Sequence, residues 1–336
     1  MAGKRRTVRK GSAARPFLLA LAAVAAVFGA GLAVSLLTEK PKPAVTARAP
    51  VAESAPAPVA VTESEPALPY EEPDPPAAEP PPQVAVLPPP PPPSGTQAPW
   101  LRNAVPAPPS AGRPVIAVVI DDLGLDRKRS ARTVKLPAPL TLAWLPYAQD
   151  LREQTKAAHA AGHELMLHIP MEPSVQADPG PEALLVRLSR DEIVRRFANA
   201  LASFDGYVGV NNHMGSRFTA DRAAMAPVLA EVQRRGLLWL DSRTSPSTVA
   251  ATLAGELKLP FAGRDVFLDN VETVSAVRAQ LAKTEAVARQ HGSAIAIGHP
   301  HDATVEALAA WLPEVRKRGF VLVPVSAVVR ARCACG

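Results

Sequence analysis

The chain has 336 residues, of which 38 are proline and 15 are aromatic, and its formal net charge is +6. All six charged side chains among the first 37 residues are basic, whereas residues 38–113 carry −3 and residues 114–336 carry +3. A globular nucleic-acid-binding protein is expected to concentrate basic residues in its folded part, so this distribution argues against a nucleic-acid partner. Two cysteines, Cys333 and Cys335, lie at the C-terminal end, so no disulfide framework holds the fold together.

A long uncharged segment follows the basic tail, residues 1–15. Residues 16–37 include 21 consecutive residues without a charge, from Phe17 to Leu37. As a helix they would be roughly 32 Å long, which matches a hydrocarbon core of about 30 Å. We expect a single-pass anchor in the inner (cytoplasmic) membrane, with the tail in the cytoplasm and the folded domain in the periplasm. The alternative is a cleaved signal peptide, but Pro50 directly follows its candidate cleavage site, Ala47–Ala49.

Residues 38–113 are rich in proline and contain 23 of the 38 prolines, six of them in the unbroken run from Pro88 to Pro93. Such a segment cannot bury enough apolar surface to fold and favours extended polyproline II conformation. We expect a disordered linker that acts as a spacer. The alternative is a docking site for an unknown proline-recognising partner.

The pattern changes at Pro114, where a unit of helix, glycine, short apolar run and polar cluster begins to recur. Each glycine stands where a helix would end in a left-handed residue. The runs predict buried parallel strands. They are Pro114–Ile120, Thr141–Leu145, Gly162–His168, Gly206–His213, Gly236–Asp241, Val266–Leu268, Gly292–His299 and Gly319–Ser326.

Helices are predicted between these strands. Ser189 and Glu192 form a capping box that opens a helix over 191–204. Thr219 can cap a helix that reaches residue 235, residues 273–290 are rich in helix formers, and Pro313 predicts a kink or a late start in the last helix. Seven to eight strands over 114–330 favour a (β/α) barrel of parallel strands over a doubly wound sheet. Residues 331–336 are expected to form a C-terminal tail.

Polar residues gather at the ends of the predicted strands, where the chemistry of such a barrel is found. Four of the seven histidines lie there, together with carboxylates. Carboxylates and imidazoles that converge on one barrel mouth are typical ligands of a divalent metal. The strand-end residues are Asp121, Asp122, His168, Asn211, Asn212, His213, Asp241, Ser242, His299 and His301.

In this order, these residues resemble the polysaccharide deacetylases of carbohydrate esterase family 4, most closely their divergent branch. The segment 119–124, Val-Ile-Asp-Asp-Leu-Gly, is similar to the family's first motif, Thr-Phe-Asp-Asp-Gly. The resemblance implies that Asp121 is the catalytic base and that Asp122 binds the metal. His299 in the segment 296–299 matches the histidine of the last motif, Leu-x-x-His, which implies a general acid. Asp241 is similar to the aspartate that orients this histidine.

The chain departs from the family at two motifs. Of the His-x-x-x-His metal pair only the first histidine is present, as His168, and Glu172 stands in place of the second. The third motif, an Arg with a Pro, has no clear counterpart, and Arg217 is a weak candidate. Because neutral imidazole is a standard zinc ligand, we expect His213 to replace the missing histidine. The predicted site is then Asp122, His168 and His213 around one divalent ion, which we expect to be zinc.

The resemblance implies a membrane-anchored, metal-dependent deacetylase that removes N-acetyl groups from an envelope polysaccharide by hydrolysing a carbon–nitrogen amide bond. The departures at Glu172 and at the third motif leave two alternatives. One is a catalytically silent barrel that binds carbohydrate or an envelope partner. The other is a metal hydrolase on the same barrel that cleaves a non-sugar amide.

Overall fold

The computed structural model describes residues 97–333. The predicted basic tail, the predicted transmembrane anchor and the linker up to residue 96 lie outside the described residues. Within 97–333, none of the helices combines the length and the apolar character needed to span a membrane.

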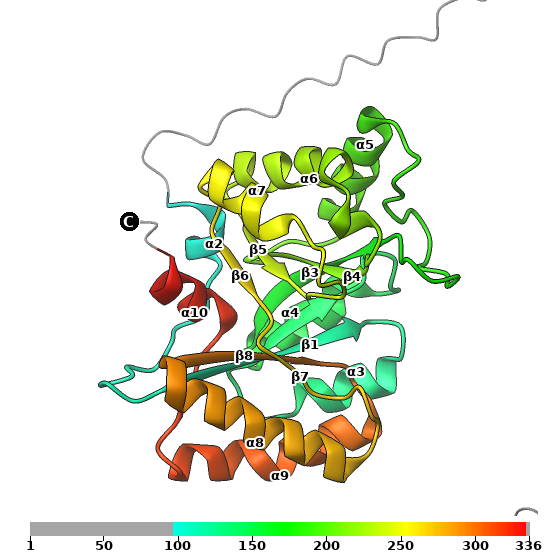
Figure 1. The fold of residues 1–336 in the computed structure, drawn as a ribbon. Helices are drawn as coiled ribbons and strands as arrows, with labels where there is room; N and C mark the ends of the chain where they lie inside the picture. The colour runs from blue at the N-terminus through cyan, green and yellow to red at the C-terminus, as the bar shows by residue number, and fades with distance from the viewer. Residues whose placement is uncertain (1–96, 334–336) are drawn as a thin grey trace, which may run out of the picture. The chain divides into compact units, whose positions relative to one another are not determined.

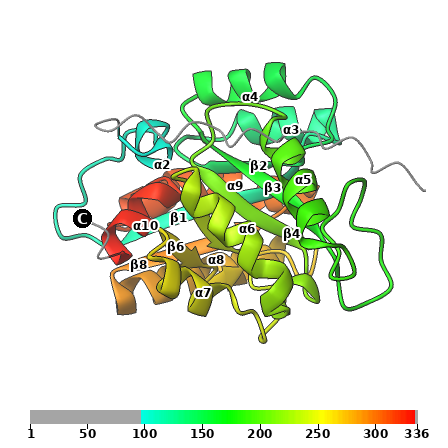
Figure 2. The same ribbon diagram turned by 90° about the horizontal axis from the view of Figure 1, so that it is seen from above.

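All strands of the described domain run parallel in one sheet, which curls with helices on its outer side (Figures 1 and 2). The order of hydrogen-bonded neighbours is β6-β5-β4-β3-β2-β1-β8-β7, and β9 also pairs with β1. The predicted parallel strands are confirmed, and β6 is an additional short strand. The strands are β1 Val115–Leu123, β2 Thr141–Trp144, β3 Glu164–Met171, β4 Gly209–Met214, β5 Leu238–Asp241, β6 Phe261–Gly263, β7 Val266–Phe267, β8 Ser293–Gly298 and β9 Val321–Leu322.

One short segment connects the two ends of the curled sheet. β6 pairs with β5, and β7 pairs with β8, but β6 and β7 do not pair with each other. Between them, the Arg264 N–H donates to Asp241 O at 3.0 Å and the Asp265 N–H donates to Ile295 O at 2.9 Å. The chain therefore crosses from one edge of the sheet to the other within two residues (Figure 1). The sheet is a partly open barrel that this segment bridges.

Helices follow most of the strands and cover the outside of the sheet (Figure 2). The Ser189 side chain accepts from the Glu192 N–H, as predicted, and Thr273 caps α8, the helix expected over 273–290. The predicted cap at Thr219 is wrong, because Thr219 lies in a 3-10 turn and Asp221 caps the next helix. Pro313 lies inside α9, so the last helix does not begin late. The helices are α2 Pro99–Arg102, α3 Arg127–Val134, α4 Leu151–Ala160, α5 Arg190–Leu201, α6 Arg222–Arg234, α7 Ala250–Leu257, α8 Val274–His291, α9 Asp302–Lys317 and α10 Val325–Arg332.

The two faces of the strands build two apolar layers. On β1, Ile116 and Val118 belong to the layer between sheet and helices, whereas Ala117 and Val119 belong to the layer inside the curl. Inside the curl, β1 and β2 contribute the small side chains of Ala117, Val119 and Ala143. Alternation by two residues therefore decides, for every strand, which side chains reach the interior.

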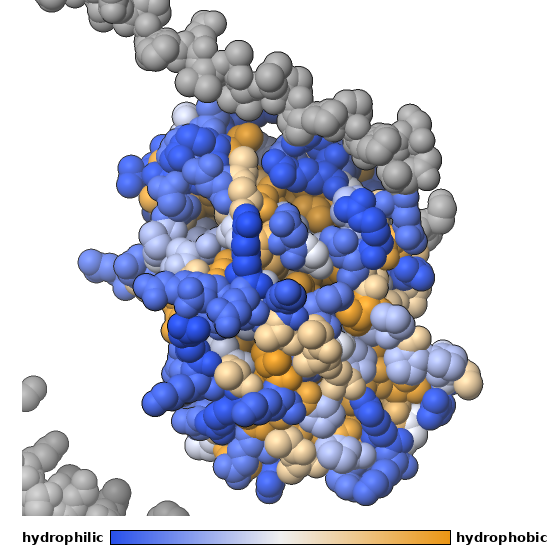
Figure 3. Space-filling model, turned by 180° about the vertical axis from the view of Figure 1, so that it is seen from behind, coloured by the Kyte–Doolittle hydropathy of each residue, from blue (hydrophilic) through white to orange (hydrophobic). Residues whose placement is uncertain are grey.

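The face of the molecule in Figure 3 is mostly hydrophilic, with apolar areas interspersed. Among residues 97–333, the exposed large apolar side chains are Leu125, Val175 and Val271, in the loops that follow β1, β3 and β7. These loops lie at the end of the sheet where the strands terminate.

The opposite end of the curl is filled by α2 and α10. Trp100 of α2 is 4% exposed, packs in the inner apolar layer and donates its backbone N–H to Gly236 O. The predicted boundary between linker and domain at 113/114 is therefore wrong, because residues from Pro99 onward belong to the fold. The predicted strand over 319–326 is only two residues long, and α10 reaches Arg332, inside the predicted tail.

A buried carboxyl group holds the first turn of α10. Glu164, at the start of β3, accepts from the Ser326 N–H at 3.1 Å, from the Ser326 hydroxyl and from the Thr141 hydroxyl at 3.1 Å. The Val325 N–H donates to Thr141 Oγ1 at 2.9 Å. Side chains of two strands thus satisfy N–H groups that a helix cannot satisfy by itself. Burial raises the pKa of Glu164 to about 7, although these hydrogen bonds act to lower it.

Replacing Trp100 by Ala is expected to lower the free energy of unfolding by about 3 kcal/mol, because a large buried side chain leaves a cavity in the inner layer. Urea denaturation of the full chain measures this. In parallel, a fragment 97–336 should be more stable than a fragment 114–336. Equal stability of the two fragments would contradict the assignment of α2 to the fold.

Replacing Glu164 by Gln is expected to remove a pH dependence of stability. Between pH ~4.5 and ~7 the folded protein retains a proton on Glu164 that the unfolded chain has lost, so the free energy of unfolding of the wild type falls as pH rises through this window, by about 3 kcal/mol. Glu164→Gln has no such proton and should lack this decrease. Urea denaturation at pH 5, 6, 7 and 8 measures the difference, and parallel curves for the two proteins would refute it.

Candidate functional site

A cavity of about 490 Å³ opens at the end of the curl where β1, β3, β4 and β8 terminate. Five of the six predicted site residues are brought together here. Asp121, Asp122, His168, His213 and His299 all line the cavity, and Arg264 of the bridging segment and Phe267 of β7 lie beside them.

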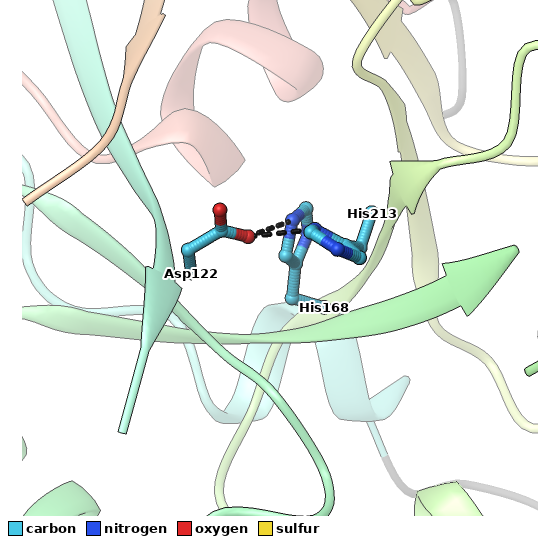
Figure 4. A group of neighbouring side chains, drawn as sticks. All are labelled: Asp122, His168 and His213. Atoms are coloured by element: carbon cyan, nitrogen blue, oxygen red, sulfur yellow. Dashed lines mark ion pairs between the residues drawn. The ribbon is translucent and has the colours of Figure 1, made fainter. Parts of the chain in front are cut away.

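Asp122, His168 and His213 form a compact group of three possible metal ligands (Figure 4). Asp122 Oδ1 is 3.1 Å from His168 Nε2 and 2.7 Å from His213 Nδ1. The potential ligand atoms of the three residues all lie within 4.8 Å of one another. One carboxylate and two imidazoles are contributed by β1, β3 and β4.

A local irregularity of β1 directs both neighbouring aspartates to the same site. Successive residues of a regular strand point to opposite faces, so Asp121 and Asp122 should diverge. The pairing of β1 with β2 shifts register between Ile120 and Leu123, and Asp122 has a φ of 58°. Aspartate tolerates this left-handed conformation better than most residues do. The bulge turns the Asp122 carboxylate toward His168 while Asp121 keeps its inward position.

The electrostatics of this group are dominated by burial and by close opposite charges. Burial acts to raise the pKa of Asp122, but the contacts with His168 and His213 outweigh it and hold that pKa well below its ordinary value. Burial acts to lower the pKa of His168, but Asp121 and Asp122 outweigh it and raise that pKa. Asp122 Oδ1 is buried and lacks a hydrogen bond of regular geometry, although two imidazole nitrogens surround it.

Asp121 is 2% exposed and lies deeper in the cavity. Its Oδ1 accepts from Asn211 Nδ2 at 2.8 Å, and its Oδ2 is 3.8 Å from His168 Nε2. Burial raises the pKa of Asp121, whereas the charges of His168 and His299 and the hydrogen bond from Asn211 act to lower it. A carboxylate with a raised pKa beside a metal-ligand group is suited to accept a proton during a reaction.

His299 approaches the same group from β8. Its Nε2 is 3.8 Å from Asp122 Oδ2, and its Nδ1 is 3.0 Å from Asp269 Oδ1. Asp269 also accepts from the His299 backbone N–H at 2.6 Å and from the Thr304 hydroxyl at 2.8 Å. Burial acts to lower the pKa of His299, but the bond to Asp269 and the charges of Asp122, Asp269 and Asp121 raise it to about 9.

The prediction that Asp241 orients His299 is wrong. Leu238 and Leu240 of β5 face the interior of the curl, so Asp241 points to the outer side. There it accepts from the Arg243 N–H at 2.8 Å and from the Thr248 hydroxyl at 2.9 Å. Asp269 holds His299 instead. The sequence signal for Asp269 was its place directly after the predicted strand over 266–268.

The other departures from the family motifs lie outside the ligand group. Glu172 accepts from the Val186 N–H at 2.6 Å and forms an ion pair with Arg217 at 2.9 Å. The weak candidate Arg217 therefore pairs with the very glutamate that replaces the motif histidine. Two arginines line the cavity, Arg243 and Arg264. Arg264 donates to Ser242 O at 2.7 Å and lies over the Phe267 ring. Sequence reasoning missed it because no motif surrounds it.

A second possible ligand group lies beside the first. Asp269, His299 and His301 also have potential ligand atoms within 4.8 Å of one another. His301 Nδ1 is 3.4 Å from Glu272 Oε2. Since Asp269 Oδ1 already contacts His299 Nδ1 and its Oδ2 accepts two hydrogen bonds, this group is organised to fix the His299 ring.

Comparison with known proteins gives concordant matches. A family model described as divergent polysaccharide deacetylase matches residues 118–329. The chain is 36% identical over 205 residues to the uncharacterized protein YibQ of Escherichia coli K12, covering 61% of this chain and 64% of YibQ. It is 35% identical over 199 residues to an uncharacterized protein of Haemophilus influenzae, covering 59% of this chain and 70% of that protein.

A solved structure agrees with these sequence matches. The uncharacterized protein ATU2773 from Agrobacterium tumefaciens C58 superposes with a TM-score of 0.67 and 31% identity, covering 69% of this chain and 95% of that one. The match spans 64% of the length of YibQ, slightly less than two thirds. The family model extends from β1 into α10 and includes every residue of the site. The resemblance noted in the sequence is thus confirmed, and this chain belongs to the divergent polysaccharide deacetylase family.

Proposed function

We propose that this protein is a membrane-anchored, metal-dependent deacetylase that hydrolyses the N-acetyl amide of an envelope polysaccharide. The observation that carries the proposal is the convergence of three kinds of group on one cavity. The cavity is lined by the three possible metal ligands, by the buried carboxylate of Asp121 and by His299, whose ring is held by Asp269. Amide hydrolysis with metal assistance needs each of these parts.

The residues present fit a divalent metal such as zinc. One carboxylate oxygen and two imidazole nitrogens are common zinc ligands, and three protein ligands leave a coordination position for chemistry. The buried Asp122 Oδ1, which lacks a regular hydrogen bond between two histidine nitrogens, is accounted for if all three atoms share an ion. An ion held there supplies Lewis-acid polarisation of the acetamide carbonyl.

The protein's own residues then divide the proton transfers. Asp121 takes the proton from the attacking water, since it is the buried carboxylate next to the ligand group. His299 gives a proton to the departing nitrogen, because its raised pKa keeps it protonated at neutral pH. Asp269 fixes the His299 ring so that Nε2 faces the cavity. The products are acetate and a free amino sugar.

A catalytically silent barrel that binds carbohydrate or an envelope partner is the second candidate. It is favoured by one observation: Glu172, in place of a family histidine, is bound to Val186 and Arg217 and is absent from the ligand group. A metal hydrolase acting on a non-sugar amide would use the same residues and differ only in its substrate. Activity on defined substrates separates the three.

The proposed location rests on the sequence. The uncharged segment 16–37 after a basic tail supports anchoring in the inner membrane, with the domain in the periplasm and the proline-rich linker as a spacer. This location is the reason for proposing an envelope polysaccharide as the substrate.

Replacing Asp122, His168 or His213 by Ala is expected to abolish binding of one zinc equivalent, because two remaining ligands hold zinc poorly. Glu172→Ala should bind zinc like the wild type, since Glu172 lies outside the ligand group. Elemental analysis of the purified proteins measures occupancy. If Glu172→Ala lost the metal while His213→Ala kept it, the ligands would be Asp122, His168 and Glu172.

Replacing Asp269 by Asn is expected to lower the rate of acetate release by about 100-fold. The reason is that His299, the general acid, loses the carboxylate that orients its ring and raises its pKa. Asp241→Asn is the matched control: it changes another buried aspartate at a strand end, whose carboxylate contacts neither the ligand group, Asp121 nor His299. Acetate release from chitin oligomers and peptidoglycan is the assay. A wild type that binds zinc and releases acetate from neither substrate would favour the silent barrel.

A further inference from the structure

The Asn211 side chain connects the two halves of the site. It lies on β4, is fully buried, and reaches both His168 and Asp121. Its Oδ1 is 2.8 Å from His168 Nδ1, and its Nδ2 is 2.8 Å from Asp121 Oδ1. A third, longer contact runs from Nδ2 to Ser242 Oγ at 3.3 Å. No motif of the family resemblance includes this residue.

The orientation of the Asn211 amide follows from its neighbours. An ionised carboxylate can only accept hydrogen bonds, so the amide nitrogen must face Asp121. The amide oxygen then faces His168 and can only accept. His168 Nδ1 must therefore carry a proton, so Nε2, which lies 3.1 Å from Asp122 Oδ1, is the nitrogen left for the ligand group. With the amide reversed, two oxygens would face each other at 2.8 Å.

We propose that Asn211 is the positioning residue that holds His168 in the tautomer that binds metal through Nε2, while donating to the base Asp121 from the same amide. This inference rests on the proposed function, because it concerns the metal site and the base defined there. Histidine ligands generally have their second nitrogen fixed by such a hydrogen bond, and losing it costs 10- to 100-fold in metal affinity.

The chain offers a matched control one residue further along β4. Asn212 is also buried, but its amide donates to Met214 O at 2.8 Å and accepts from the Ser242 N–H at 3.0 Å. It contacts neither a ligand nor the base. Asn211→Leu and Asn212→Leu therefore each remove one buried amide from the same strand, and only the first removes the link between His168 and Asp121.

The test measures zinc affinity and the His168 ring in the full-length protein. Asn211→Leu should bind zinc about 10- to 100-fold more weakly than the wild type, and Asn212→Leu should bind it like the wild type. In zinc-loaded protein with ¹⁵N-labelled histidine, NMR should show a slowly exchanging proton on His168 Nδ1 in the wild type and in Asn212→Leu. This proton should be lost or exchange rapidly in Asn211→Leu. Thermal unfolding of each variant verifies that it is folded.

Asn211→Asp distinguishes the hydrogen bond to His168 from the hydrogen bond to Asp121. It keeps an acceptor for His168, so zinc affinity and the Nδ1 proton should be retained. It replaces the amide donor to Asp121 by a second carboxyl group, and two adjacent carboxyl groups share a proton that lowers the capacity of Asp121 to act as a base, so acetate release should fall below that of the wild type. Unchanged zinc affinity in Asn211→Leu, or a wild-type His168 with no proton on Nδ1, would overturn the role toward the metal. Full acetate release by Asn211→Asp would overturn the role toward Asp121.

These outcomes are distinct from failure of the proposed activity. A wild type that binds zinc but releases no acetate would overturn the deacetylase proposal. The affinities and the Nδ1 proton would still confirm or contradict the role of Asn211, because neither measurement needs a substrate.

Discussion

The alternation of side chains along the strands is the constraint on which the site depends. Every strand that enters the curl sends alternate residues inward, and the inner layer is narrow. At the ends of β3, β4 and β8, this places His168, Asn211 and His299 on the inner side. A shift of one residue in any of these strands would replace a site residue by an outward-facing neighbour. The bulge at Asp122 breaks this alternation, and it lies where two adjacent carboxylates enter one cavity.

Much of the architecture could be predicted from sequence because it follows from strong local signals. Buried parallel strands appear as continuous apolar runs, and glycines such as Gly162 and Gly292 adopt the left-handed conformation that ends a helix. Convergence of Asp122, His168 and His213 followed from their positions at the ends of strands. These features depend on local spacing and on the general geometry of parallel sheets.

The features of the fold and of the site that the sequence did not predict depend on contacts between segments far apart in the chain. The inward or outward direction of Asp241 is set by where β5 begins, and Asp269 is recruited because β7 pairs with β8. In the sequence, Trp100 stands in a proline-rich stretch, and its contact with Gly236 in the folded chain shows that it belongs to the domain. The end of β9 after two residues reflects Pro324 and the capping of α10 by side chains from β2 and β3. In each case a contact between segments far apart in the chain decides the outcome.

The end of the curl that α2 and α10 fill determines on which side of the domain the cavity is open. α2 and α10, the first and last helices of the described domain, both pack where the strands begin, and the cavity opens where the strands end. The chain therefore enters the described domain before α2 and leaves it after α10, on the side opposite to the cavity (Figure 1). The polarity of the parallel sheet thus places both ends of the described chain at one end of the curl and the mouth of the cavity at the other.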